Sequence, residues 1–141
     1  MITKIVTLRA SAEIATATTE NGAAIKLQRH YTEMVVTLDV TAAATAAGDI
    51  LDVYVDTSFD GGTTWVNLGR FTRVLGNGGA KKFIMSFAAV PLTSSNSVAF
   101  GADQSESAAL QIGFGDNIRY RGITTQSDTV AFTYLVTAFL K

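Results

Sequence analysis

The sequence predicts an all-β protein, a single-domain antiparallel β-sandwich or jelly-roll-like barrel of about eight to ten strands. Three observations support this prediction. Apolar and polar residues alternate along short runs, which is the period of a half-buried strand. Turn-forming residues separate these runs at spacings typical of sandwiches and barrels. The 141 residues suffice for one domain with a sizeable core, so we expect residues 1–141 to form one β domain.

The N-terminal residues 1–20 alternate weakly and contain Thr-Ala runs. Such a segment forms either an edge strand of the domain's own sheet, with a hairpin at residues 20–22, or an arm that pairs with the sheet edge of an adjacent subunit. It lacks the continuous apolar run of a signal peptide, and no apolar stretch approaches the roughly 20 residues of a transmembrane helix. We therefore expect a protein made in the cytoplasm that is neither secreted nor bound to a membrane.

Five later runs alternate with a period of two and are predicted to be strands. They cover residues 31–40, 50–57, 81–87, 117–123 and 129–141. The last run is apolar on both faces, with Val136 on one face and Leu135 and Phe139 on the other, so we expect it to be covered on both sides. Residues 41–48, TAAATAAG, have room for only about two helical turns and form either a short helical turn or a loop.

The longest irregular region covers residues 91–108, which are rich in Ser, Asn and Gly and contain the only proline. Long loops in compact domains are commonly binding elements or are ordered by a partner, and simple flexibility is the alternative.

The charge distribution excludes several functional classes. The net charge is −1, and only 16% of the residues are charged. Acids and bases are scattered along the chain, so there is no electrostatic footprint for nucleic acid or an anionic membrane. The absence of cysteine excludes disulfides, thiolate metal sites and cysteine nucleophiles. A weakly charged surface of this kind suits a subunit that buries much of it in an assembly.

The most specific run is SFDGGTTW, residues 58–65, which contains the only tryptophan. A carboxylate at Asp60 can accept backbone N–H groups across a turn, and two glycines can adopt the positive φ that other residues avoid. Trp65 can lay its ring across the base of the resulting hairpin. We expect a structural role for the hairpin set Ser58, Asp60, Gly61, Gly62, Thr64 and Trp65.

This run fits the pattern Ser-x-Asp-x-Gly-x-Thr-Trp and resembles the Asp-box, a hairpin motif of sialidase propellers and of unrelated β proteins. In the Asp-box families these residues lie away from the catalytic centre, so the resemblance also implies a structural role. A propeller needs at least four blades with the box recurring, whereas this chain has one copy and room for about two blades, so a sialidase is excluded.

A second resemblance covers residues 51–74 and 116–136. The order LDVYVDTSFDGGTTWVNLGRFTRV, a Gly-rich connector and DNIRYRGITTQSDTVAFTYLV is similar to small virion structural proteins of tailed bacteriophages. The resemblance implies a capsid decoration (cement) protein or a tail-associated structural protein, located in the virion. It implies a β-sandwich that works as a homo-oligomer, with a trimer favoured, on the major capsid protein of the particle.

No residue is predicted to be catalytic, to bind a cofactor or to bind a metal, and we expect no enzymatic activity. Asp52 and Asp56 share one strand face, but at roughly 13 Å they are too far apart for a glycosidase pair and are expected to face solvent. A calcium site built from Asp49, Asp52 or Asp60 is a minor alternative, because oxygen ligands cluster there, but their spacing is not that of an EF-hand. His30 has no second histidine and no Ser-His-Asp context, so we expect a surface or turn residue.

A carbohydrate-binding module is the non-viral alternative, because β-sandwiches of this size often present aromatic platforms to sugars. The candidate platform residues are Trp65, Tyr54 and Tyr120. Exposed aromatics that line a groove would favour sugar binding, whereas a large exposed apolar patch would favour assembly into a particle.

Overall fold

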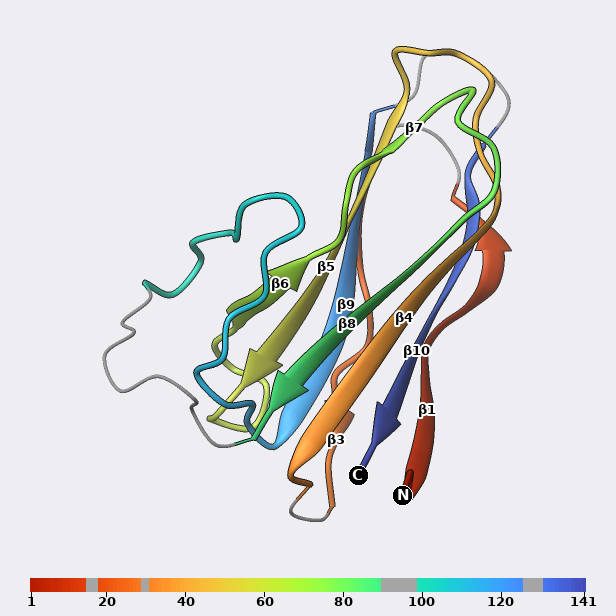
Figure 1. Cartoon of the computed structure of the whole chain (residues 1–141). Helices are drawn as coiled ribbons and strands as arrows, with labels where there is room; N and C mark the ends of the chain where they lie inside the picture. Colours follow the sequence, from red (N-terminus) through yellow and green to blue (C-terminus); the bar gives the residue numbers. More distant parts are fainter. Residues whose placement is uncertain (15–17, 29–30, 90–98, 126–130) are drawn as a thin grey trace.

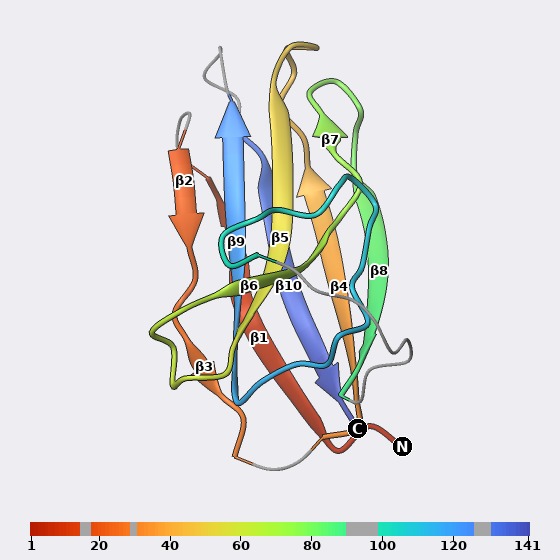
Figure 2. The same ribbon diagram turned by 90° about the vertical axis from the view of Figure 1, so that its left-hand side faces the viewer.

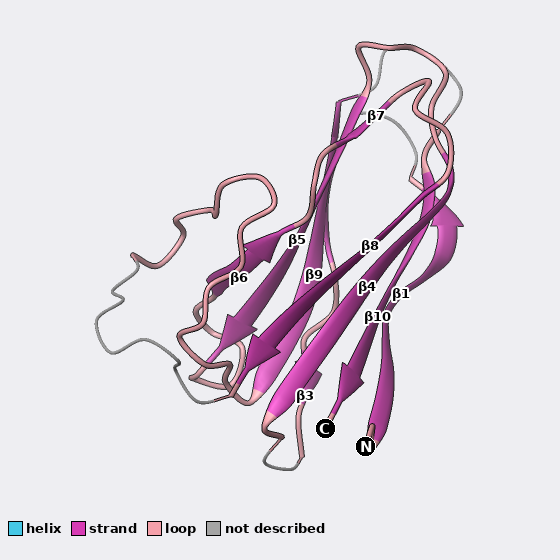
Figure 3. Ribbon diagram, viewed as in Figure 1, coloured by secondary structure: helices cyan, strands magenta, loops and turns pink. Residues whose placement is uncertain are grey.

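The computed structural model describes residues 1–14, 18–28, 31–89, 99–125 and 131–141. Within these ranges the chain forms ten β-strands and no helix (Figures 1 and 3). The strands are β1 (Lys4–Glu13), β2 (Thr18–Asn21), β3 (Ile25–Lys26), β4 (Glu33–Ala42), β5 (Ile50–Ser58), β6 (Val66–Arg70), β7 (Val74–Leu75), β8 (Lys81–Ala88), β9 (Asn117–Thr125) and β10 (Thr133–Leu140). In β4 and β10 every second side chain is buried, as the period of two predicts.

The strands form two antiparallel sheets that face each other (Figures 1 and 2). The first sheet has the order β1-β10-β4-β8. The second sheet has the order β2-β9-β5-β6, and β3 and β7 pair with β9 and β5 respectively. The predicted all-β sandwich is therefore confirmed.

The order of the strands is that of a jelly roll. Along the chain the pairs β1·β10, β2·β9, β4·β8 and β5·β6 nest one inside the next, so the chain forms one long hairpin that wraps into two sheets. The nesting brings the first strand beside the last, and both termini lie at the same end of the sandwich (Figure 1).

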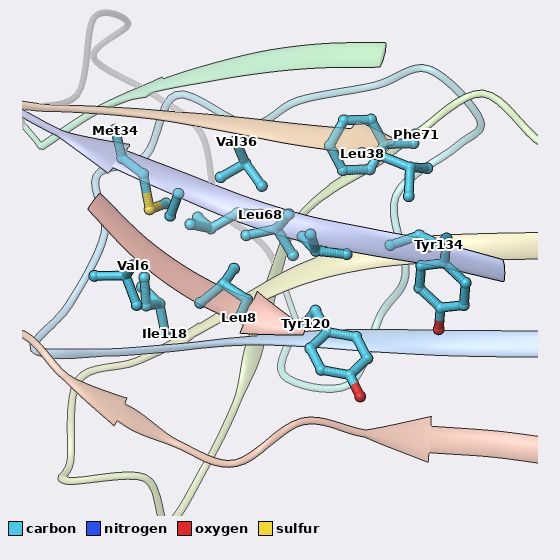
Figure 4. Packing of buried hydrophobic residues seen from close by; sticks show 14 of the residues in the cluster. Val6, Leu8, Met34, Val36, Leu38, Leu68, Phe71, Ile118, Tyr120 and Tyr134 are labelled. Carbon is cyan, nitrogen blue, oxygen red and sulfur yellow. The ribbon is translucent and has the colours of Figure 1, made fainter. Parts of the chain in front are cut away.

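The core lies between the inner faces of the two sheets (Figure 4). Alternate residues of β4, among them Met34, Val36 and Leu38, point inward from the first sheet and are essentially inaccessible to solvent. They face Leu68 of β6 and Ile118 of β9 in the second sheet. Apolar burial of this kind contributes about 25 cal/mol per Å² and is the main force that holds the sheets together.

Residues 4–13 form an edge strand of the domain's own first sheet, in which β1 pairs with β10. The predicted hairpin at residues 20–22 is wrong, because β2 and β3 both pair with β9 and the chain runs on along that strand. The amide of Gly22, which lies between β2 and β3, donates to the carbonyl of Tyr120 in β9 at 3.0 Å. This bond continues the pairing with β9 from β2 to β3. Residues 20–22 therefore stay extended along β9 and do not form a turn.

Two further expectations can be compared with the structure. Residues 41–48 contain the end of β4 and a turn without a helix, in which the Asp49 amide donates to the Ala46 carbonyl at 3.0 Å. The expectation that the last strand is covered on both sides is wrong for the single chain. The inner residues of β10 are buried, whereas Leu135 and Phe139 on its outer face stay partly exposed.

Candidate functional site

The hairpin of residues 58–65 joins β5 to β6 and is organised by the carboxylate of Asp60. Its Oδ1 accepts hydrogen bonds from the hydroxyl of Ser58 at 2.7 Å and from the amides of Thr63 and Thr64 at 3.1 and 2.8 Å. Its Oδ2 accepts from the hydroxyl of Thr64 at 2.6 Å. One carboxylate thus takes four donors of the turn.

The other residues of the motif complete the turn. The Oγ of buried Ser58 accepts from the amide of Gly62 at 2.9 Å. Gly61 and Gly62 have φ values of 73° and 92°, a region in which a Cβ clashes with the backbone. The sequence Asp-Gly-Gly therefore supplies one acceptor and two left-handed residues at the point where the chain reverses.

The carboxyl group of Asp60 has a lowered pKa in the folded protein. Hydrogen bonds from Thr64, and then from Ser58 and Thr63, lower the pKa of Asp60 from 3.8 to about 2, because they stabilise the charged form. The hairpin is therefore held by an ionised group at neutral pH.

Trp65 connects this hairpin to β9. Its partly exposed ring lies 4.2 Å below the guanidinium of Arg119, a cation–π contact. The indole also lies beside the backbone of Gly62. Because Arg119 covers its face, Trp65 does not form an open stacking platform.

Asp56 lies next to Trp65 and is buried beneath two arginines. Its Oδ2 accepts from the Nε atoms of Arg119 and Arg121, each at 3.2 Å, and its Oδ1 accepts from Asn67 at 2.9 Å. Only 3% of its side chain is exposed. The expectation that Asp56 faces solvent is wrong, because the neighbouring strands β6 and β9 supply side chains that cover it.

Asp52 is buried in the same way further along β5. It accepts from Arg70 at 2.8 Å and from Arg73 at 2.9 Å. Burial alone would raise the pKa of Asp52, but the hydrogen bonds from Arg73 and Arg70 outweigh burial and lower the pKa below its usual value. The expectation of a solvent-facing side chain is therefore wrong for Asp52 as well.

The segment of residues 99–116 crosses the outer side of β6 and helps to cover Asp56 and its partners (Figure 2). The amide of Gln104 donates to the Oδ1 of Asn67 at 2.9 Å. The carboxylate of Asp103 binds the guanidinium of Arg121. Residues 99–108 of the predicted long loop are thus anchored to the second sheet, and residues 91–98 lie outside the described residues.

A hollow of about 240 Å³ opens beside the hairpin. It is lined by Asp56, Trp65, Asn67, Gly101, Asp103, Arg119 and Arg121. The two carboxylates balance the two guanidinium groups, so the hollow carries no net charge. It is smaller than the roughly 300–1,000 Å³ of most small-molecule sites.

Two of the three aromatic residues predicted for a sugar platform are buried. Tyr54 and Tyr120 are each only 5% exposed. The ring of Tyr54 lies 4.3 Å from the guanidinium of Arg121, and the hydroxyl of Tyr120 donates to Glu20 at 2.7 Å. Trp65 is thus the one member of that predicted set that reaches the surface.

The outer face of the first sheet carries exposed apolar and threonine side chains, which are outward residues of β1, β10, β4 and β8. Ile5 is 62% exposed and Ile84 is 73% exposed. The residues between them are partly or fully exposed. These residues are Thr7, Val35, Thr37, Leu135, Thr137 and Phe139. Charge is confined to ion pairs such as Lys82–Asp39, at 3.0 Å.

Among the described residues, no group of three or more His, Asp or Glu side chains could hold a metal ion. The carboxylate of Asp52 forms ion pairs with two arginines, and that of Asp60 accepts hydrogen bonds within its own hairpin. His30 lies outside the described residues. No helix within the described ranges is long and apolar enough to cross a membrane.

Comparison with known proteins identifies a shared fold. No protein-family model matches the sequence, and no curated protein matches it. A chain in the solved structure of infectious bursal disease virus, Gx strain, superimposes on 97% of this chain with a TM-score of 0.54 and 11% sequence identity. This chain spans 31% of the length of that viral chain. At this identity the similarity is one of fold.

Sequence reasoning missed the arginines that neutralise the aspartates of β5. The spacing of Asp52 and Asp56 on one strand, and of Arg119 and Arg121 on another, was the available signal. Each pair lies on one strand face, but only the register of β5 against β9 places Asp56 opposite Arg119.

Proposed function

We propose that this chain is a virion structural protein that acts by binding alone, as a decoration (cement) protein on the capsid of a tailed bacteriophage. The observation that carries the proposal is the apolar outer face of the first sheet, on a jelly roll that resembles a chain of a virus structure over 97% of its length. An exposed apolar sheet face is typical of a surface that another protein covers.

The proposed mechanism requires shape and contact area. A decoration protein stabilises a shell through many modest contacts, which an oligomer multiplies by avidity. The outer face offers β-branched and aromatic side chains with charge held in ion pairs, so its burial desolvates few unpaired charges. The partner in this proposal is the major capsid protein of the particle.

The hairpin of residues 58–65 and the strand that contains Arg119 support the phage assignment, because they carry the resemblance to small phage virion proteins. In this proposal the hairpin maintains the fold and the outer face makes the contacts. A tail-associated structural protein is the alternative location, and it uses the same surface.

The test is addition of the purified protein to empty shells of the parent phage, with bound protein measured by co-sedimentation and shell stability measured by calorimetry. We expect saturable binding and a higher melting temperature of the shell. Binding to tails with none to shells would assign the protein to the tail. Absence of binding to either particle part would contradict the virion proposal.

The hollow beside Trp65 favours a carbohydrate-binding module as the second candidate. The two terminal nitrogens of Arg119 donate to no described residue, and the carboxylate of Asp103 is partly exposed, so the hollow offers both donors and an acceptor. Retention of the protein on a polysaccharide column, abolished by Trp65→Ala and unaffected by Ile84→Lys on the first sheet, would support this candidate. A wild-type protein that is not retained on the column, or a Trp65→Ala variant that is retained as the wild type is, would exclude it.

A further inference from the structure

The edge strand β8 leaves part of its backbone unpaired. One side of β8 pairs with β4. On the other side, the side-chain amide of Gln111 donates to the carbonyl of Ser86 at 3.0 Å, and its Oε1 accepts from the amide of Ala88 at 3.1 Å. Gln111 thus takes the place of a neighbouring strand at the last three residues of β8.

The position of Gln111 shows which backbone groups of β8 face outward. In an antiparallel strand the N–H and C=O of one residue point to the same side, and successive residues alternate. Because Ser86 and Ala88 point toward Gln111, Lys82 and Ile84 also point away from β4. The described residues supply no hydrogen bond to the backbone of either.

The unpaired segment also exposes an apolar side chain. Ile84 is 73% exposed on the outer face, and its neighbours Phe83 and Met85 are only partly buried on the inner face. Exposed apolar edge strands are templates for pairing with another chain, and lysine is a common means of preventing it. Here Lys81 and Lys82 protect the beginning of β8 only, and Asp39 neutralises Lys82 at 3.0 Å.

We propose that β8 pairs with β8 of a second copy of this chain, antiparallel and across a twofold axis, with Ile84 opposite Ile84. Directly opposed residues on antiparallel strands point to the same face of the sheet, whereas neighbouring residues of one strand point to opposite faces. When a strand pairs with its own copy across a twofold axis, one residue must therefore lie opposite the same residue of the copy. Ile84 has outward N–H and C=O groups, so the two copies exchange two hydrogen bonds at this position. The two first sheets then join into one continuous sheet.

The charges of the strand suit this partner. With Ile84 at the centre, Lys82 of one copy lies opposite Ser86 of the other, so the lysines of the two copies do not face each other. The side chain of Gln111 leaves the carbonyl of Ser86 in this pairing, and the backbone N–H of Lys82 from the second copy takes its place. The inner side places Phe83 opposite Met85, an apolar pair. The same edge therefore supplies both halves of the contact, and Lys82 of each copy keeps its ion pair with Asp39.

This inference rests on the proposed function, since it specifies how the structural subunit self-associates, but its test needs no shell. A twofold contact builds a dimer or an assembly of dimers. The trimer favoured by the resemblance to phage virion proteins requires a different contact, so the mass of the protein in solution distinguishes the two.

The experiment is sedimentation equilibrium of the whole chain at several concentrations. We expect a reversible dimer. The variant Ile84→Pro lacks the outward N–H, a change that an edge strand accepts, and should raise the dimer dissociation constant about thirtyfold through loss of two hydrogen bonds. Circular dichroism and thermal melting check that the variant folds.

Two further variants separate edge pairing from packing of the sheet face. Ile84→Lys places like charges opposite each other and should also raise the dimer dissociation constant. Ile5→Lys is the matched control, because Ile5 is 62% exposed on the same outer face but lies on β1, at the opposite edge of the sheet. This control should remain dimeric.

A wild-type chain that is monomeric at every concentration, or a trimer, would overturn the inference. So would an Ile84→Pro variant that folds and dimerises as the wild type does, or dissociation caused by Ile5→Lys alone. The shell assay with Ile84→Pro is a separate measurement. A monomeric variant that still binds shells would retain both proposals, whereas a dimeric wild type that ignores shells and tails would contradict the proposed function only.

Discussion

Asp60 and Thr64 are joined by two hydrogen bonds, one from the amide of Thr64 to Oδ1 at 2.8 Å and one from its hydroxyl to Oδ2 at 2.6 Å. Both carboxylate oxygens are therefore used within one turn of the chain. The geometry accounts for the Asp and the second Thr of the motif without any ligand.

The first prediction concerns the pH dependence of this hairpin. Because the pKa of Asp60 is lowered from 3.8 to about 2 in the folded state, its stabilisation is fully present above pH 3.8 and is lost as pH falls toward 2. We expect Asp60→Ala to lower the melting temperature at pH 7, with the difference from wild type shrinking below pH 3.8. Thr64→Ser keeps the hydroxyl and is the control, which should follow wild type. A difference independent of pH would contradict the role of the ionised carboxylate.

The second prediction compares a buried ion pair with an exposed one. Asp56→Ala leaves the guanidinium groups of Arg119 and Arg121 without their shared buried carboxylate, and we expect a loss of about 3–5 kcal/mol in the free energy of unfolding. Asp39→Ala breaks the pair with Lys82, whose side chain is 81% exposed, and should cost less than about 1 kcal/mol. Urea denaturation measures both, and equal losses would show that burial of Asp56 does not matter.

The third prediction concerns stability in alkali. Burial, followed by the hydrogen bond to Glu20, raises the pKa of Tyr120 from 10.0 to about 12, and burial also raises the pKa of Tyr134. Folding thus favours the protonated phenols, so this stabilisation is present below pH 10.0 and is lost as pH rises toward 12. Titration followed by tyrosinate absorbance should show tyrosines that ionise above the usual pH in the folded protein and at the usual pH in denaturant. Tyr120→Phe should remove one of these tyrosines. Ordinary titration of every tyrosine in the folded protein would refute this.

The fourth prediction concerns the close approach of the two sheets at Gly69. A Cβ at this position would lie 2.4 Å from the Sδ of Met85 and 3.1 Å from the Ala108 carbonyl oxygen. We expect Gly69→Ala to destabilise the protein by about 1–3 kcal/mol through overpacking. Gly48→Ala is the matched control, because nothing lies within 4 Å of its Cβ position, and it should be neutral or stabilise by up to about 1 kcal/mol. Equal effects on the melting temperature would mean that Met85 moves aside without cost.

Several local features were predictable because they depend on neighbouring residues. Met34, Val36 and Leu38 occupy every second position of their run, and their burial follows from the period of a strand. The hairpin at Asp60 follows from turn chemistry. The prediction of a hairpin at residues 20–22 was wrong, because pairing with the distant strand β9 outweighs the local turn preference of these residues.

The sequence by itself determined the fold class, the positions of the long strands and the turn at Asp60, since period, turn residues and hydrogen-bonding side chains act over a few positions. Only the tertiary structure decided the jelly-roll order, the burial of Asp56 beneath Arg119 and the open edge of β8. These features depend on which strands pair and in what register. Asp56 and Arg119 are 63 positions apart, and no local pattern determines that such residues meet.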